Sequence, residues 1–227
     1  MTFTAKDVAD LRAKTGAGMM DCKKALTESD GNTEAAEKWL REKGILSAQK
    51  KSARIASEGI VDSYIHAGGR MGVLVEVNCE TDFVARGDKF RELVHDIALQ
   101  IGAMKPLYVS SADVPADIIE GEKNILRAQI ANDPKLAKKP PQIIDTMIDG
   151  RVKKYYEDFC LLDQTFVKDP SKTIGQLVTE AVAQIGEKIS VRRFVCFEMG
   201  EGLEKKSENL AEEVEKQAAA AAAKSGK

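Results

Sequence analysis

The chain has 227 residues and is balanced in charge, with 34 Lys and Arg against 36 Asp and Glu; a direct nucleic-acid-binding role usually requires a basic surplus, so we expect none. The four cysteines, Cys22, Cys79, Cys160 and Cys196, are far apart and the chain has only two histidines, which argues against a bound metal. No apolar run approaches the ~18 residues of a membrane span, so we expect a cytoplasmic protein with free thiols, no membrane contact and no cofactor.

The first 46 residues are expected to form three short helices joined by glycine-containing turns. A glycine-rich break at Thr15–Gly18 separates the first helix from a second that runs from about Met19 to Glu28. Asn32 is a suitable N-cap for a third helix, and Gly44 fits its C-terminus. So small a module is only marginally stable alone, so we expect it to be a partner-docking domain.

Residues 47–58 are basic and contain alanine, which indicates a helical linker. An α+β core and dimerisation domain is expected at 59–200, followed by a charged and then alanine-rich tail at 201–227. The elements expected in the core are extended segments at 60–67 and 73–77 joined by a Gly68-Gly69 turn, helices at 88–101, 116–132, 141–157 and 174–185, and a strand at 189–198. This order predicts an antiparallel sheet backed by helices.

The first motif covers residues 11–26, Leu-Arg-Ala-Lys-Thr-Gly-Ala-Gly-Met-Met-Asp-Cys-Lys-Lys-Ala-Leu. It places Met19 and Met20 on or beside the glycine turn. Because successive residues do not share one face of a helix, at least one of the two methionines should be exposed, where its flexible side chain suits protein docking. The alternative is that both methionines fill the core of the small module.

The second motif covers residues 76–86, Glu-Val-Asn-Cys-Glu-Thr-Asp-Phe-Val-Ala-Arg, and connects a predicted strand to a predicted helix. An acid and a large aromatic residue, Asp82 and Phe83, are adjacent at the tip of this connection. The alternative is that Phe83 packs inward and Asp82 caps a turn, because a lone aromatic side chain is more often buried than presented.

Both motifs resemble the two signature motifs of the elongation factor Ts family, bacterial and organellar. The first has that family's Leu-Arg, Thr-Gly and Lys-Lys-Ala-Leu groups, and the second has Glu-Val-Asn and Thr-Asp-Phe-Val through Arg86. Further similarity lies at 139–140, 150–151, 164–167 and 170–173, so the resemblance covers nearly the whole chain. The opening module also resembles the ubiquitin-associated three-helix fold.

The resemblance implies a guanine-nucleotide exchange factor in translation elongation and not an enzyme. Such a factor binds the GTPase elongation factor Tu with GDP, displaces Mg²⁺ and disturbs the phosphate site, so that GDP leaves and GTP enters. The implied partner-docking residues are Arg12, Met19 and Met20, and the implied Mg²⁺-displacing residues are Thr81, Asp82, Phe83 and Val84.

The longest members of that family carry two related copies of the core module, whereas this chain resembles the short form. Its Thr-Asp-Phe-Val segment is followed almost directly by residues 90–106, which correspond to the second copy. A single copy leaves an edge or a face of its sheet uncovered. We therefore expect a two-fold symmetric homodimer that regenerates the two-copy core.

Three other functions stay open from the residues alone. A ubiquitin-associated-type binding module on an unrelated scaffold would retain binding in its first fifty or so residues and would not need Phe83. An enzyme using Asp82 or Cys79 would show turnover without any GTPase. An RNA-binding protein would show strong salt dependence. None of these accounts for both motifs together.

Overall fold

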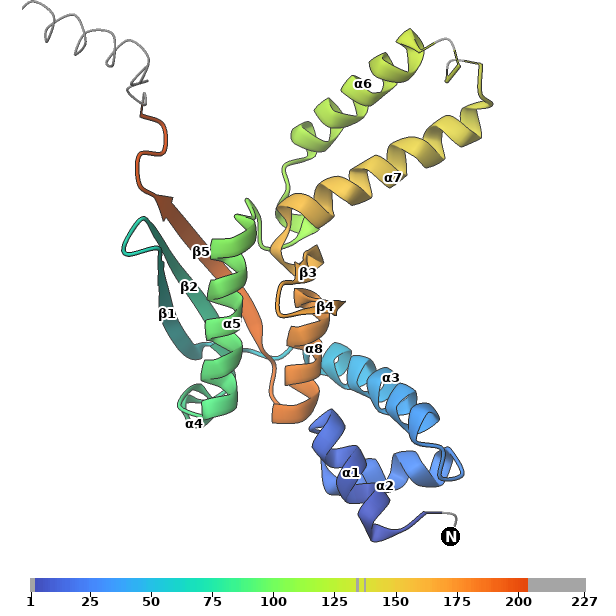
Figure 1. The fold of residues 1–227 in the computed structure, drawn as a ribbon, viewed down its shortest axis with the longest axis vertical. Helices are drawn as coiled ribbons and strands as arrows, with labels where there is room; N and C mark the ends of the chain where they lie inside the picture. Colours follow the sequence, from blue (N-terminus) through green and yellow to red (C-terminus); the bar gives the residue numbers. More distant parts are fainter. Residues whose placement is uncertain (1–2, 134, 137, 204–227) are drawn as a thin grey trace, which may run out of the picture.

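The structure is a computed structural model, which describes residues 3–133, 135–136 and 138–203, and it has the predicted α+β fold. Figure 1 shows an N-terminal group of helices, a sheet with helices packed against it, and a helical hairpin that projects from this core. Most of the predicted tail at 201–227 lies outside the described residues.

Three helices form the N-terminal module: α1 (Ala5–Thr15), α2 (Met19–Glu28) and α3 (Thr33–Lys51). The observed bounds of α2, Met19–Glu28, are therefore those predicted for the second helix. The Asn32 side chain caps α3 by accepting a hydrogen bond from the Ala35 amide at 3.0 Å, as its position predicted. The buried core of the module consists of Val8, Leu11, Cys22, Ala25, Leu26 and Ala36.

The prediction that Gly44 ends the third helix is wrong, because α3 continues without a break to Lys51. At Gly44 the helix packs against α8 (Ile174–Ile185), and a Cβ atom on the glycine would lie 3.2 Å from the Ala183 Cβ. The glycine therefore permits a close approach of two helices. The helical part of the predicted linker is the end of α3, and a turn then leads into the first strand.

The main sheet has three antiparallel strands in the order β1 (Glu58–His66), β2 (Met71–Cys79) and β5 (Ser190–Glu198). Gly68 and Gly69 form the predicted hairpin turn with positive φ angles of 65° and 92°. Helix α5 (Asp88–Met104) lies across this sheet with α8 beside it (Figure 1). Their shared core includes Val73, Val75, Val77, Phe90, Leu93, Val94, Ile97, Ile101 and Ile174.

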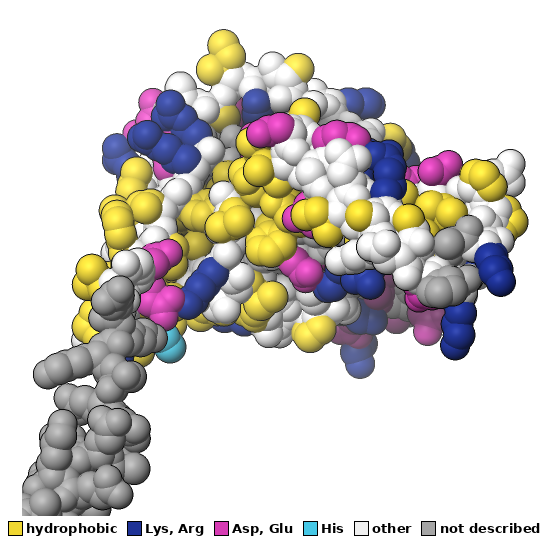
Figure 2. Space-filling model, turned by 90° about the horizontal axis from the view of Figure 1, so that it is seen from above, with side chains coloured by type: hydrophobic (Ala, Val, Ile, Leu, Met, Phe, Trp, Pro, Cys, Tyr) yellow, Lys and Arg dark blue, Asp and Glu magenta, His cyan; other side chains and the backbone are white. Residues whose placement is uncertain are grey.

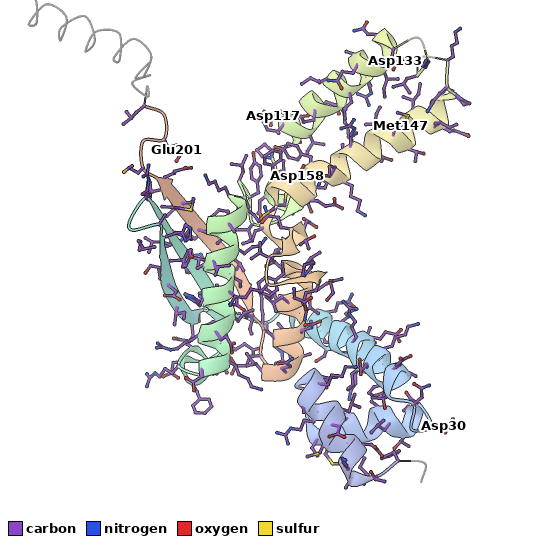
Figure 3. All side chains as sticks on the ribbon, in the orientation of Figure 1. Asp30, Asp117, Asp133, Met147, Asp158 and Glu201 are labelled. Carbon is purple, nitrogen blue, oxygen red and sulfur yellow. The ribbon has the colours of Figure 1, made fainter. Side chains whose placement is uncertain are left out.

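The projecting hairpin consists of α6 (Ala116–Asn132) and α7 (Pro141–Phe159), which pack on one another through Ile130, Ile148 and Val152. Figure 3 labels Asp117 at the core end of α6 and Asp133 just past its outer end. None of the described helices combines the length and the apolarity that a bilayer span requires. Figure 2 shows hydrophobic side chains gathered in the middle of the face that it presents, with charged side chains around them.

The sequence reading missed several short elements. These are α4 (Asp82–Ala85), the 3-10 turns at Ser111–Asp113 and Leu161–Asp163, and the hairpin of β3 (Thr165–Phe166) and β4 (Asp169–Thr173). The hairpin is held by two buried amides rather than by an apolar pattern. Gln100 donates to the Gln164 side chain at 3.2 Å and to the Thr165 carbonyl at 3.1 Å, and accepts from the Val167 amide at 2.9 Å.

Two glycines should respond to alanine in opposite directions. Gly59 has a φ of 144°, and its added Cβ would lie 2.2 Å from the Val77 carbonyl oxygen, so Gly59→Ala should lower the free energy of unfolding by roughly 2–4 kcal/mol. Gly121 lies inside α6 with open space around it, so Gly121→Ala should raise that free energy by about 0.5–1 kcal/mol. Urea unfolding measures both changes, and shifts in the same direction would contradict this account.

Candidate functional site

The second motif forms a turn between β2 and α5. Asp82–Ala85 is a single helical turn, and Thr81 caps it with a side chain that accepts from the Val84 amide at 3.3 Å. Asp82 forms a surface ion pair with Arg86, with the carboxylate and guanidinium atoms 2.9 Å apart. The carboxylate thus lies at the start of the turn, where it also interacts favourably with the helix N-terminus.

Phe83 is 85% exposed, so the alternative in which its ring packs inward is wrong. The helical turn explains the outcome, because adjacent positions point in different directions around a helix axis. Val84 is half-buried against the core and Ala85 is buried, which leaves Phe83 on the outward side. The structure therefore presents a large apolar ring to solvent on a short, capped and well-anchored turn.

The first motif presents a second exposed apolar group. Met19 and Met20 are the first two residues of α2, and they are 45% and 74% exposed. The alternative in which both methionines fill the module's core is wrong, because Cys22, Ala25 and Leu26 occupy the inward side of the same helix. Arg12 is exposed on α1, close to the glycine turn, and its carbonyl accepts from the Gly16 amide at 2.8 Å.

The structure does not arrange the second motif for covalent chemistry. The Cys79 thiol is fully buried and donates to the Thr81 carbonyl at 3.2 Å, and burial raises the pKa of this thiol. A raised pKa leaves little of the nucleophilic thiolate at neutral pH. Within the described ranges, no group of three or more His, Cys, Asp or Glu side chains is placed to hold a metal ion.

One supporting residue was missed from the sequence. Glu187, 107 residues beyond Glu80, accepts hydrogen bonds from the backbone at the base of the Phe83 turn. Nothing in its local sequence distinguishes it from other charged residues after a helix, because its role depends on a contact between distant segments. The only local signal is Gly186, which ends α8 with a φ of 91° just before Glu187.

The chain is similar to proteins of one family along nearly all its length. The family model described as Elongation factor TS matches residues 4–201. Elongation factor Ts of Desulfitobacterium hafniense is 58% identical over 214 residues, which is 94% of this chain and 97% of the relative. Elongation factor Ts of Alkaliphilus metalliredigens is 57% identical over 219 residues, which is 96% of this chain and 100% of the relative. The chain therefore belongs to the elongation factor Ts family, the nucleotide exchange factors of translation elongation.

Proposed function

We propose that this protein binds elongation factor Tu in its GDP form and promotes GDP release by displacing Mg²⁺ and disturbing the phosphate site. The observation that carries the proposal is the exposed ring of Phe83 on an anchored turn, with the acidic side chain of Asp82 beside it. A ring this exposed gains free energy when a partner buries it. The protein acts through binding alone, without a cofactor or covalent step of its own, and works in the cytoplasm with translation.

The physical route to GDP release runs through the Mg²⁺ ion of the GTPase. Such an ion bridges protein and nucleotide phosphates and neutralises their charge, so displacing it weakens the hold on GDP. Thr81 and Val84 set the turn from which Phe83 enters the partner, and Asp82 brings a carboxylate that competes for the cation. Burying one Phe side chain contributes only about 1.5–3 kcal/mol, so a wider interface must contribute the rest.

The N-terminal module supplies that wider interface. Met19 and Met20 offer exposed apolar surface, and Arg12 offers a cation on the neighbouring helix. We propose that these residues dock on the nucleotide-binding domain of the GTPase. Coupling between the two binding events is reciprocal, so nucleotide that rebinds to the GTPase weakens its hold on this protein and lets it leave.

The experiment that tests this function is release of fluorescent GDP from purified elongation factor Tu, followed with and without this protein. We expect strong acceleration that grows with protein concentration and then saturates. A folded protein, as judged by circular dichroism, that leaves the release rate unchanged would remove the proposal.

We further propose a homodimer formed through the sheet. The face of the sheet that α5 does not cover exposes five large apolar side chains, Val61, Ile65, Leu74, Val195 and Phe197. Cross-strand register places Leu74 opposite Val195, so these side chains form one patch. An exposed apolar patch on a sheet marks an interface, and a two-fold axis through it would let each copy cover the other.

Leu74→Asp is expected to weaken this dimer at least tenfold, because a carboxylate buried in the apolar interface would have no partner. Light scattering during size-exclusion chromatography should give the dimer for the wild type and a monomer of 24.8 kDa for the variant at the same micromolar concentration. Ile118→Asp, a matched change on α6, should leave the dimer intact. A wild-type protein that elutes as a clean monomer would refute the dimer.

A further inference from the structure

The C-terminal end of α8 touches both motifs. Gln184, in the last turn of this helix, donates from Nε2 to the Thr15 carbonyl oxygen at 3.0 Å, in the glycine turn of the first motif. The fit is close, because a Cβ on Gly16 would lie 2.9 Å from the Gln184 side chain. Three positions further along the chain, Glu187 contacts the second motif. One short segment thus joins the docking turn to the Phe83 turn.

The Glu187 carboxylate holds the base of the Phe83 turn with three hydrogen bonds. Its Oε2 accepts from the amides of Glu80 and Thr81, each at 3.0 Å, and its Oε1 accepts from the Thr81 hydroxyl at 2.7 Å. In this third bond the Thr81 hydroxyl is the donor. A lone pair of the Thr81 oxygen is then directed to the Val84 amide, the bond that caps α4. Glu187 therefore fixes the hydroxyl that shapes the turn carrying Phe83.

A second carboxylate, that of Glu80 in the second motif, accepts a hydrogen bond from the segment after α8. Glu80 accepts from the Lys188 amide at 2.6 Å and pairs with the Arg54 guanidinium at 3.3 Å. The hydrogen bond from Lys188 and the nearby Arg54 cation hold the pKa of Glu80 below its ordinary value, so this carboxylate is ionised at neutral pH. Lys188 Nζ in turn donates to the Arg54 carbonyl at 2.9 Å. The segment that follows α3 therefore contacts the same two residues, Glu80 and Lys188.

We propose, on the basis of the exchange function proposed above, that Gln184 and Glu187 are positioning residues that hold the docking turn and Phe83 at a fixed separation. The link between the two is the segment 184–187, which begins in the last turn of α8, the helix against which α3 of the docking module packs. A surface that is already ordered loses little conformational entropy on binding, so the GTPase meets both elements in place. Loss of the Glu187 hydrogen bonds leaves docking intact but lets Phe83 move away from the direction in which it enters the partner.

The test compares GDP release from elongation factor Tu over a range of protein concentrations for the wild type and Glu187→Ala. We expect the maximal release rate to fall roughly tenfold, the effect of losing charge-assisted hydrogen bonds, with a change below about threefold in the half-saturating concentration. Glu180→Ala removes an acid of the neighbouring helix α8 that pairs with Lys172 at 2.6 Å, and should leave both quantities unchanged. Glu187→Gln keeps the acceptor oxygen for the two amides and should restore part of the rate.

A double-mutant cycle separates positioning from general destabilisation. In a Phe83→Ala background, Glu187→Ala should change the maximal rate by less than about twofold, because the residue it positions is gone. Equal effects in both backgrounds would overturn the inference, as would a Glu187→Ala protein as active as the wild type. If Glu187→Ala fails to fold, Thr81→Val removes the same hydroxyl donor at nearly constant shape and should reproduce the loss. A wild-type protein without activity would instead refute the exchange function itself.

Discussion

Phe83→Ala is expected to lower the maximal rate of GDP release by ten- to a few-hundredfold. The ring is 85% exposed in the free protein, so its removal costs the fold almost nothing and its loss is felt only in the complex. Burying a Phe side chain contributes about 1.5–3 kcal/mol, and each 1.4 kcal/mol corresponds to a tenfold change. If this ring moves the phosphate loop and the Mg²⁺ ligands of the partner, that free energy appears in the release step rather than in docking.

Fluorescent GDP release at saturating protein measures this effect, and thermal unfolding should show the same midpoint for variant and wild type. Ile125→Ala is a matched control, because this side chain is 53% exposed on α6 of the projecting hairpin. Phe83→Leu, which keeps apolar volume without the ring, should give an intermediate rate. A Phe83→Ala protein that releases GDP as fast as the Ile125→Ala control would remove Phe83 from the mechanism.

Local patterns were sufficient for the bounds of three helices. The bounds of α2, α6 and α8 agree with the predicted 19–28, 116–132 and 174–185, because the apolar spacing typical of a helix lies within each segment. The end of α3 was missed because Gly44 has two physical uses, a C-cap or a close helix contact. Only the position of Ala183, far along the chain, decides between them.

The site shows the same division between local and distant information. Spacing alone left Phe83 and the two methionines either buried or presented, and it favoured burial of Phe83, because a lone apolar side chain carries no sign of its direction. The resemblance between the motifs and a known family changed that balance. Glu187 and Gln184 stayed unseen, since each acts through a backbone group of a segment far away in sequence. A residue that supports a motif from a distance leaves no local pattern.

The two exposed elements should differ in the kinetic quantity that each controls. In the proposed mechanism Phe83 acts after the complex forms, so its loss should lower the maximal rate, whereas Met19 and Met20 would dock the partner and should determine the half-saturating concentration. The double change Met19→Ala/Met20→Ala is expected to raise that concentration roughly ten- to hundredfold, because two exposed methionines lose the apolar area that the partner would bury. The maximal rate should change by less than about threefold.

The same release assay, run as a concentration series, measures both quantities in one experiment. Met104→Ala is a matched control, since this methionine is also 45% exposed but ends α5, outside both motifs. A double variant that lowers the maximal rate at unchanged half-saturation would contradict the assignment of docking to the first motif. A lower maximal rate for Phe83→Ala and a higher half-saturating concentration for the methionine variant would together show that one surface binds the GTPase and the other loosens its nucleotide. The contacts of Gln184 and Glu187 link the two elements, which would let both act on one partner at the same time.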